Sequence, residues 1–537
     1  MLANCARQPA PSDSPTTSNV IFILADDLGI MDINAYANHY TGLPADSLFY
    51  RTPHLDRLVR EGVAFSQAYA TQLCSPTRAG ILAGKFAPRL GFMTAMPLRE
   101  TYYNQQLPVP EGYNRHDVLD HHDDIAIARA WDNATSNSAL TPEVLALPEA
   151  MPRHHAAFLG KWHIGGFGAA GVQPQDQGFE ALAYYDAGAS AYYNWQPSWN
   201  NKSLRRFPDM PQEEWKIGKA GPPTAQEYLT DDLTQRAVDY LDTRLATPGQ
   251  PFFLYLSHFA VHAPYQGKPA ETEYYAQRAA RGTLDHVDPA YASLLEGLDR
   301  SVGRIMDHLA ATGLAKNTVI VFMSDNGGID RDITPKGDGT DNDPFLGGKA
   351  CLTEGGIRVP LIVWRPGTTG GQWVDHPVDY TDIYPTILEA GGYDATTVID
   401  REQLDGRSVL PLLDGRAADY GEKTRFWHYP FNVIYNSPYD GFALTPHSAV
   451  RRGDYKLIFD WYGRLHLYDL VADPYEQNDL ADRQLALRDE LLEELLSWLQ
   501  ANVGKRYYPQ LNPGYTPTEE ARTVPFRNLL PAGFLGK

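Results

Sequence analysis

A cysteine with an unusual set of neighbours is the first candidate for chemistry in this sequence. Cys74 stands two residues before Pro76 and four before Arg78, and an apolar run up to Gly84 follows. Pro76 removes a backbone donor and restricts Ser75 to extended geometry, which predicts Cys74 on a turn at the mouth of a helix, where an anion is favoured. Arg78 would lie one turn further on, within reach of the cysteine. Taken alone, Cys74 also fits a small buried apolar residue or a reactive thiolate.

Two pairs of oxygen donors follow apolar runs elsewhere in the chain. Asp26 and Asp27 come after the run 19–25, and Asp325 and Asn326 come after the run 318–323. Carboxylate and amide oxygens suit Ca²⁺ or Mg²⁺ and not Zn²⁺. A single acidic pair at a strand end is usually a helix cap or a turn former. Two such pairs, together with the cysteine stretch, favour a metal site.

Further cations and histidines could handle an anionic group and its protons. Lys161 and Lys349 lie in apolar or glycine-rich surroundings, although a lysine is usually a solvated surface charge. His163 and His262 follow two apolar runs and are candidates for acid–base chemistry. His258 lies close to His262 in the sequence and is the alternative to it.

These side chains need elements that bring them together. Short apolar runs at 19–25, 154–160, 252–256 and 318–323 each end within a few residues of one candidate group. Strands alternating with helical patterns at 53–64, 231–245 and 291–309 predict an α/β fold, a large, mixed, mostly parallel sheet sandwiched by helices. Ligands bind beyond the carboxyl ends of such strands, so we expect the candidate residues to meet at one edge.

The pattern changes towards the C-terminus. A further strand is expected at 359–364, and alternating segments at 448–451, 455–459 and 465–469 predict an antiparallel sheet, followed by a helix at 483–499. We therefore divide the chain into an N-terminal tail (1–18), a catalytic α/β domain (19–415) and a smaller C-terminal α+β subdomain with a Pro- and Tyr-rich tail (416–537).

Taken together, the motifs resemble those of the type I, formylglycine-dependent sulfatases of the alkaline phosphatase superfamily, including bacterial arylsulfatases and polysaccharide sulfatases. The resemblance spans about residues 19–480. It implies that Cys74 is oxidised to formylglycine by a formylglycine-generating enzyme, and that the modified residue completes a Ca²⁺ site, with Mg²⁺ the second choice. The motifs that carry it are Asp-Asp-Leu-Gly at 26–29, Cys-Ser-Pro-Thr-Arg at 74–78, Gly-Lys-Trp-His at 160–163, Ser-Asp-Asn-Gly at 324–327, and Lys349 before Glu-Gly-Gly-Ile-Arg-Val-Pro at 354–360.

The resemblance also implies a role for each residue. The hydrated formylglycine, activated by the metal and Asp325, would attack the sulfur of a sulfate ester, while His262 and Lys349 help the alcohol to leave. His163 would then remove a proton from the second hydroxyl, so that the aldehyde reforms and sulfate is released. Arg78 and Lys161 would hold the hydrate and the sulfate oxygens. The implied metal ligands are Asp26, Asp27, Cys74, Asp325 and Asn326.

The substrate is harder to predict. Aromatic and polar side chains could stack on sugar rings or bind their hydroxyl and carboxylate groups, although each fits an ordinary core or loop residue equally well. The best candidates are His428, Trp195, Tyr193, His122 and Arg451. They favour a sulfated carbohydrate over a lipid. The alternatives are a phosphonate or phosphodiester hydrolase of the same superfamily and a catalytically silent protein that binds sulfated glycans.

Composition bounds the partners and the compartment. The formal net charge is -20, which argues against nucleic acid or an anionic membrane as the main partner. The three cysteines are too few for a disulfide framework, and no apolar run is long enough to span a bilayer. The weak resemblance of residues 2–5 to a lipoprotein box suggests a periplasmic or secreted protein, lipid-anchored at Cys5 in one alternative. The sequence leaves the oligomeric state open.

Overall fold

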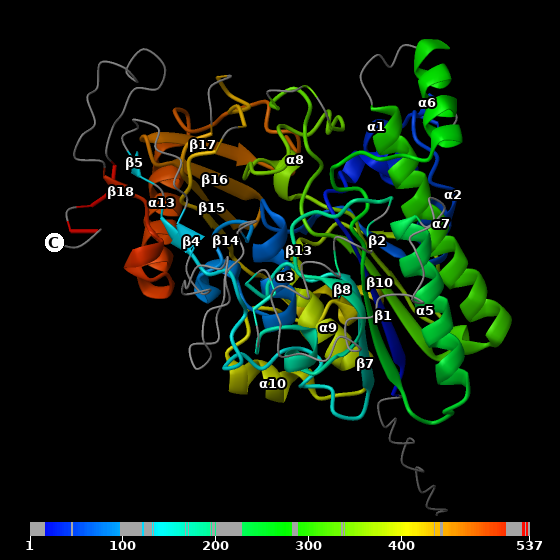
Figure 1. The fold of residues 1–537 in the computed structure, drawn as a ribbon. Helices are drawn as coiled ribbons and strands as arrows, with labels where there is room; N and C mark the ends of the chain where they lie inside the picture. Colours follow the sequence, from blue (N-terminus) through cyan, green and yellow to red (C-terminus); the bar gives the residue numbers. More distant parts are fainter. Residues whose placement is uncertain are drawn as a thin grey trace, which may run out of the picture.

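An eight-stranded sheet with the order β12-β2-β11-β10-β1-β9-β7-β8 runs through the larger part of the protein (Figure 1). Its central strands are β10 (Thr318–Ser324), β1 (Asn19–Ala25), β9 (Phe252–Ser257) and β7 (His155–Lys161). The flanking strands are β12 (Gln372–Val374), β2 (Val63–Phe65), β11 (Leu361–Trp364) and β8 (Glu180–Tyr185). The computed structural model describes residues 17–44, 47–96, 121–122, 131–132, 134–166, 168–169, 171–193, 195, 199, 228–281, 288–334, 337, 339–433, 435–440, 444–511, 529–531 and 533–534.

Most neighbouring strands of this sheet are parallel, as the alternation of strands and helices predicts. The pairs β10–β1, β1–β9, β9–β7 and β7–β8 are all parallel. β11 is the exception, because it runs antiparallel to both β10 and β2. The strand predicted at 359–364 therefore exists, but it begins at residue 361. Its antiparallel pairing makes the sheet a mixed one.

Helices cover both faces of the sheet, which explains why the interiors of its central strands are apolar on both sides. α2 (Pro53–Glu61), α5 (Leu229–Leu245) and α7 (Pro289–Thr312) pack on one face, with α1 (Asn34–Thr41) and α6 (Pro269–Arg281) on the same side (Figure 1). α3 (Cys74–Ala83) and α9 (Ile383–Ala390) pack on the other, where α10 (Ala395–Glu402) also lies. In β1, Ile21 and Ile23 pack in the hydrophobic core on the side of α2, α5 and α7, and Phe22 and Leu24 pack in the core on the side of α3 and α9. Successive side chains of a strand point to opposite faces, as this alternation shows.

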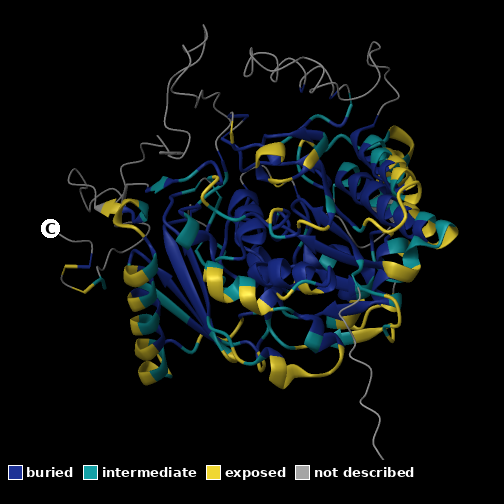
Figure 2. Ribbon diagram, turned by 90° about the horizontal axis from the view of Figure 1, so that it is seen from below, coloured by how far each residue is buried: buried dark blue, intermediate teal, exposed yellow. Residues whose placement is uncertain are grey.

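A second sheet follows the first along the chain. It has the order β14 (Arg425–Tyr429), β15 (His447–Arg452), β16 (Tyr455–Asp460) and β17 (Arg464–Asp469), and every pair is antiparallel. α13 (Leu485–Asn502) packs on it, with Leu491, Leu495 and Leu499 buried and its outer side exposed (Figure 2). The antiparallel sheet and the C-terminal helix are confirmed; the domain boundary at 415/416 stays a prediction.

The remaining elements are short. They are α8 (Glu354–Ile357), α11 (Leu410–Leu413), α12 (Ala417–Tyr420), the strand pairs β3 (Ala68–Tyr69) with β13 (Val378–Asp379), β4 (His121–His122) with β6 (Thr135–Ser136), and β5 (Trp131–Asp132) with β18 (Gln510–Leu511). In the described part of the chain, no helix combines the length and the apolar character needed to cross a membrane. Cys5 lies outside the described residues.

Candidate active site

The four central strands deliver their polar residues to one edge of the sheet. β10, β1, β9 and β7 are neighbours and parallel, so their carboxyl ends point the same way. Asp26 and Asp27 follow β1, Asp325 and Asn326 follow β10, Lys161 ends β7, and His262 lies beyond the end of β9. The convergence expected from the sequence is therefore observed, and it places acids, cations and a histidine around one point.

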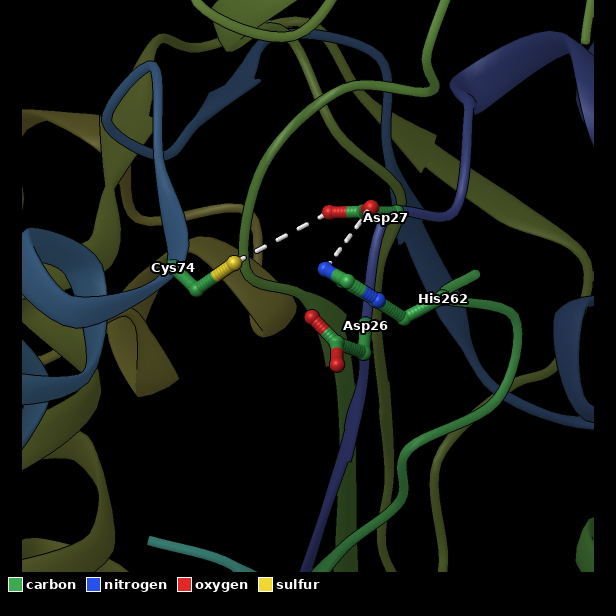
Figure 3. Close-up of side chains that lie close together, drawn as sticks. All are labelled: Asp26, Asp27, Cys74 and His262. Atoms are coloured by element: carbon green, nitrogen blue, oxygen red, sulfur yellow. Dashed lines mark hydrogen bonds and ion pairs between the residues drawn. The ribbon is translucent and has the colours of Figure 1, made fainter. Parts of the chain in front are cut away.

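Cys74 is the first residue of α3, and its side chain faces this edge. The side chain is 1% exposed, and its thiol donates to Asp27 Oδ1 over 3.8 Å (Figure 3). Pro76 is the third residue of the helix. The N–H groups of a first turn have no partner within the helix, so a proline there costs no hydrogen bond, and Ser75 before it is helical. The expectation that Ser75 is extended is wrong for that reason. Burial, followed by the charge of Asp325, raises the pKa of the Cys74 thiol, which argues against the thiolate alternative.

Three ion pairs, all buried, form the charged framework of the site. Lys161 Nζ lies 2.7 and 2.9 Å from the two carboxylate oxygens of Asp26. Arg78 Nη2 lies 2.7 Å from Asp325 Oδ2 and 3.7 Å from Asp26 Oδ1. The framework thus joins β1, β7, β10 and α3, and none of these four residues is more than 1% exposed.

The third pair joins Lys349 to Asp27. Lys349 Nζ lies 2.7 Å from Asp27 Oδ2, and Asn326 Nδ2 donates to Asp27 Oδ1 over 2.8 Å. Burial alone would raise the pKa of Asp27, but the charge and hydrogen bond of Lys349, with the charge of Lys161, outweigh it and hold the pKa below the ordinary value for an aspartate. Asp27 has a φ of 61°, in the left-handed region, and its amide donates to Asp325 Oδ1 over 3.2 Å. The backbone there turns back on itself and aims the carboxylate at the cluster.

His262 and His163 approach the cluster with defined ring nitrogens. His262 Nε2 lies 3.6 Å from Asp27 Oδ2, and its Nδ1 is 2.6 Å from the carbonyl oxygen of Ala263 (Figure 3). His163 Nε2 lies 3.2 Å from the carbonyl oxygen of Met96, while its Nδ1 is buried without a hydrogen-bond partner. Burial lowers the pKa of both histidines, that of His262 to about 3. Both rings are therefore neutral in the protein as it stands.

His258, the alternative to His262, occupies a different place. Its side chain is completely buried, and Nε2 lies 3.0 Å from Ser301 Oγ on α7. It therefore contacts the helical layer behind the sheet, and His262 is the histidine that reaches the cluster.

The donor set fits a hard divalent cation. The side-chain ligand atoms of Asp26, Asp27, Cys74 and His262 all lie within 4.8 Å of one another (Figure 3). Asn326 Oδ1 is buried and has no hydrogen-bond partner, as a carbonyl oxygen reserved for a metal would be. Carboxylate and amide oxygens are the ligands of Ca²⁺ and Mg²⁺. His262 is an addition to the donors expected from the sequence, and Asp325 Oδ2 is engaged by Arg78.

Two serines support the site, and the sequence analysis did not identify this role for either of them. Ser257, the last residue of β9, donates to the carbonyl oxygen of Lys161 over 2.8 Å and also accepts from Arg78. Ser75 Oγ donates to the carbonyl oxygen of His163 over 2.7 Å and accepts from the amide of Met96. The position of Ser257 at a strand end was the one available signal for it.

Three of the residues predicted to bind substrate make their recorded contacts with residues outside this cluster. Trp195 is completely buried and packs against Trp199. His428, on β14, is 2% exposed, and its ring bonds Ser448 Oγ and the carbonyl oxygen of Tyr507. Arg451, on β15, bonds to residues outside the cluster. Interior packing occupies Trp195 and His428, so these placements argue against contact between their side chains and a substrate at Cys74.

The remaining two predicted residues are placed less fully. Tyr193 is half-buried and meets the ring of Tyr228 edge-on, with the centroids 5.0 Å apart. His122 lies in β4, which pairs with β6, and its side chain is outside the described part of the structure. A role for either residue in substrate binding stays a prediction.

The fold and the site define a hydrolase of the alkaline phosphatase superfamily. A sequence profile described as Sulfatase matches residues 18–393, and one described as N-sulphoglucosamine sulphohydrolase, C-terminal, matches residues 347–502. The chain belongs to the sulfatase family, and it is a sulfuric ester hydrolase.

Similar proteins match over most of this chain. A sulfatase of Formosa agariphila is 26% identical over 93% of this chain and 91% of its own. The mouse N-acetylgalactosamine-6-sulfatase is 30% identical over 76% of this chain and 68% of its own. The crystal structure of Ps i-CgsB in complex with k-i-k-neocarrahexaose superimposes with a TM-score of 0.69 at 23% identity, covering 94% of this chain and 96% of that one. The last likeness shows the fold, including the mixed sheet and the antiparallel C-terminal sheet.

Proposed function

We propose that this sulfatase removes sulfate from a sulfated carbohydrate at the cluster around Cys74, after oxidation of Cys74 to formylglycine by a formylglycine-generating enzyme. The observation that carries the proposal is the convergence of three buried cations, three carboxylates and two histidines on the first residue of α3. Formylglycine, when present, supplies the nucleophile that a buried thiol with a raised pKa does not.

A divalent cation, Ca²⁺ rather than Mg²⁺, would be held by Asp26, Asp27, Asp325 and Asn326, next to residue 74. It would add positive charge where the three carboxylates and the three basic side chains otherwise balance. The balance follows from the pairs Lys161–Asp26, Lys349–Asp27 and Arg78–Asp325. Ca²⁺ accepts more ligands and less regular geometry than Mg²⁺, which suits donors from two separate strand ends.

The basic side chains hold the sulfate group. Lys161 and Lys349 are anchored by carboxylates, and Arg78 is fixed by Asp325 and by the carbonyl oxygen of Lys161, which Nη1 meets at 2.9 Å. They need no reorganisation when negative charge grows on the ester oxygens, and fixed donors of this kind lower the barrier most effectively.

The two histidines handle protons at opposite stages. His262 Nδ1–H donates a hydrogen bond to the carbonyl oxygen of Ala263, so Nε2 faces the cluster without a hydrogen. Nε2 first takes up a proton from solvent, which reaches the partly exposed ring, and then passes it to the departing alcohol oxygen, with Lys349 beside it. His163 Nε2–H donates a hydrogen bond to the carbonyl oxygen of Met96, which leaves His163 Nδ1 without a hydrogen and able to act as the base. Each ring has one nitrogen tied to the backbone and one available for chemistry.

Two alternatives remain open to experiment. The phosphonate monoester hydrolase of Agrobacterium radiobacter shares the fold, with a TM-score of 0.54 at 19% identity. Rates on an aryl sulfate and on an aryl phosphodiester, measured per mole of formylglycine, separate the two hydrolases. A silent glycan-binding protein would retain sulfated oligosaccharides without releasing sulfate. Faster cleavage of the phosphodiester, or no sulfate release from any glycan at full formylglycine content, would overturn the proposal.

The cellular context belongs to the same proposal. A sulfated polysaccharide is met outside the cytoplasm, so we assign the enzyme to the periplasm or the exterior, with lipid attachment at Cys5 as the weaker alternative. We also propose that the chain is divided into a catalytic domain (19–415) and a C-terminal subdomain (416–537). Sulfate release from a panel of sulfated glycan fragments identifies the sugar and the position of the ester.

A further inference from the structure

A cavity lies at the junction between the two sheets. It has a volume of about 530 Å³, and its walls come from the end of α1, the turn between β2 and β3, the segment after β12, and the turns after β15 and β17. None of the residues that line it belongs to the cluster around Cys74. Whatever occupies this cavity therefore binds at a place separate from that of the proposed reaction.

The floor of the cavity contains a guanidinium group without an ionic partner. Arg451 is 1% exposed, and its three hydrogen-bond acceptors are all neutral: the carbonyl oxygen of Gly453 at 3.2 Å, Gln67 Oε1 at 2.5 Å, and the hydroxyl of Tyr69. Within the described ranges of the chain, no carboxylate lies within 4.0 Å of it. Burying a charged group without an opposite charge is costly, so this arrangement calls for an anion.

The neighbouring charges do not supply that anion. Arg358, also in the cavity wall, is paired with Glu354 at 2.6 Å. Lys456 lies 2.7 Å from Glu354 and 2.7 Å from Glu476. The buried cations Arg451, Arg358 and Lys456 thus share two carboxylates, those of Glu354 and Glu476. One positive charge is left in excess. Burial lowers the pKa of Arg451, and this effect together with the like charges of Arg358 and Arg425 outweighs the attraction of the more distant Glu354.

We propose that this cavity binds a small oxyanion, a sulfate or a carboxylate, through Arg451. Gln67 is half-buried at the wall, and its amide oxygen holds the place that an oxyanion would take on the guanidinium. The rim carries the exposed acids Asp375, Glu422 and Asp454. Such a rim repels an extended polyanion but admits a single small anion, which selects free sulfate or one charged sugar unit.

The test is a binding titration of the full-length Cys74→Ala protein with sodium sulfate and, separately, with sodium glucuronate, at ionic strength held constant with sodium chloride. Two sulfate sites are expected, one at the catalytic cluster and one in the cavity. Arg451→Met removes the cavity site and leaves the other. Lys349→Met weakens the catalytic site and leaves the cavity site. Glucuronate competing at the cavity site assigns a sugar carboxylate as ligand, and its failure to compete assigns inorganic sulfate.

Two milder variants keep the proposal testable if Arg451→Met does not fold. Gln67→Ala removes the neutral competitor and should tighten binding at the cavity site about fivefold, the worth of one ordinary hydrogen bond. Asp454→Asn removes one rim charge and should tighten it about twofold. Crystals soaked in selenate should show an anomalous peak beside Arg451. A single sulfate site unaffected by Arg451→Met and Gln67→Ala, or an empty cavity in the selenate crystals, would overturn the inference.

Discussion

Replacing Lys349 by methionine separates catalysis from stability. Lys349 Nζ lies 2.7 Å from Asp27 Oδ2, and the residue is 7% exposed, so its charge is fixed and poorly screened. Removing one fixed donor of this kind raises a reaction barrier by about 3 kcal/mol, which corresponds to a loss of about 100-fold in kcat/KM. The measurement is hydrolysis of an aryl sulfate at 20 °C, normalised to the formylglycine and Ca²⁺ content of each preparation.

The matched control is Lys423→Met. Lys423 Nζ lies 2.7 Å from Asp379 and 2.9 Å from Asp382, and the exposure of its side chain, 5%, is close to the 8% of Lys349. Both variants lose a buried ion pair, so both should lower the free energy of unfolding by about 3–5 kcal/mol. Only Lys349→Met should lose activity. Equal losses in the two variants, or a Lys349→Met enzyme within fivefold of the wild type, would refute the role given to Lys349.

Three other outcomes are expected. Cys74→Ala should abolish sulfate release with an unchanged circular dichroism spectrum, and a mass spectrum of the wild-type tryptic peptide containing residue 74 should show the aldehyde. Chelation of Ca²⁺ should lower both activity and Tm, and Ca²⁺ should restore them better than Mg²⁺; restoration by neither would remove the metal from the proposal. Burial raises the pKa of Asp299 to about 7, so the folded protein holds this proton more tightly than the unfolded chain does and loses stability as the pH rises from about 4 to 7. Asp299→Asn keeps the acceptor for the His54 and Leu55 amides and should gain stability over the wild type across that range, by roughly 1.4 kcal/mol per unit of pKa shift; a difference independent of pH would contradict this.

The site was predictable from sequence because of where its residues lie on the strands. β1 and β10 are continuous apolar runs, and a parallel sheet puts the carboxyl ends of such runs at one edge. The groups that follow them then meet whatever the length of chain between them. Asp27 and Asp325 are almost three hundred residues apart in the sequence, and the backbone amide of Asp27 donates to Asp325 Oδ1 over 3.2 Å.

Substrate contacts were not predictable in the same way. His428 and Trp195 have the residue types that bind sugars, but the same types fill protein interiors, and the sequence does not distinguish the two uses. His428 is satisfied by Ser448 and by the backbone of Tyr507, far along the chain from it. The prediction of an extended Ser75 was wrong because a proline is tolerated in the first turn of a helix, so Pro76 does not keep the residue before it out of the helix.

The net charge of -20 does not prevent the binding of an anionic ester, because local charges decide the field inside the site. Surface carboxylates are screened by salt beyond about 8 Å, whereas two charges 4 Å apart in a partly buried site interact by about 4 kcal/mol. Asp26, Asp27 and Asp325 balance the three basic side chains, so these six residues alone give no attraction for a sulfate ester. A divalent cation on their oxygens would tip the balance to positive. The ester carries one negative charge and gains more as the S–O bond breaks, so the metal, more than any single lysine, would set the affinity for the transition state.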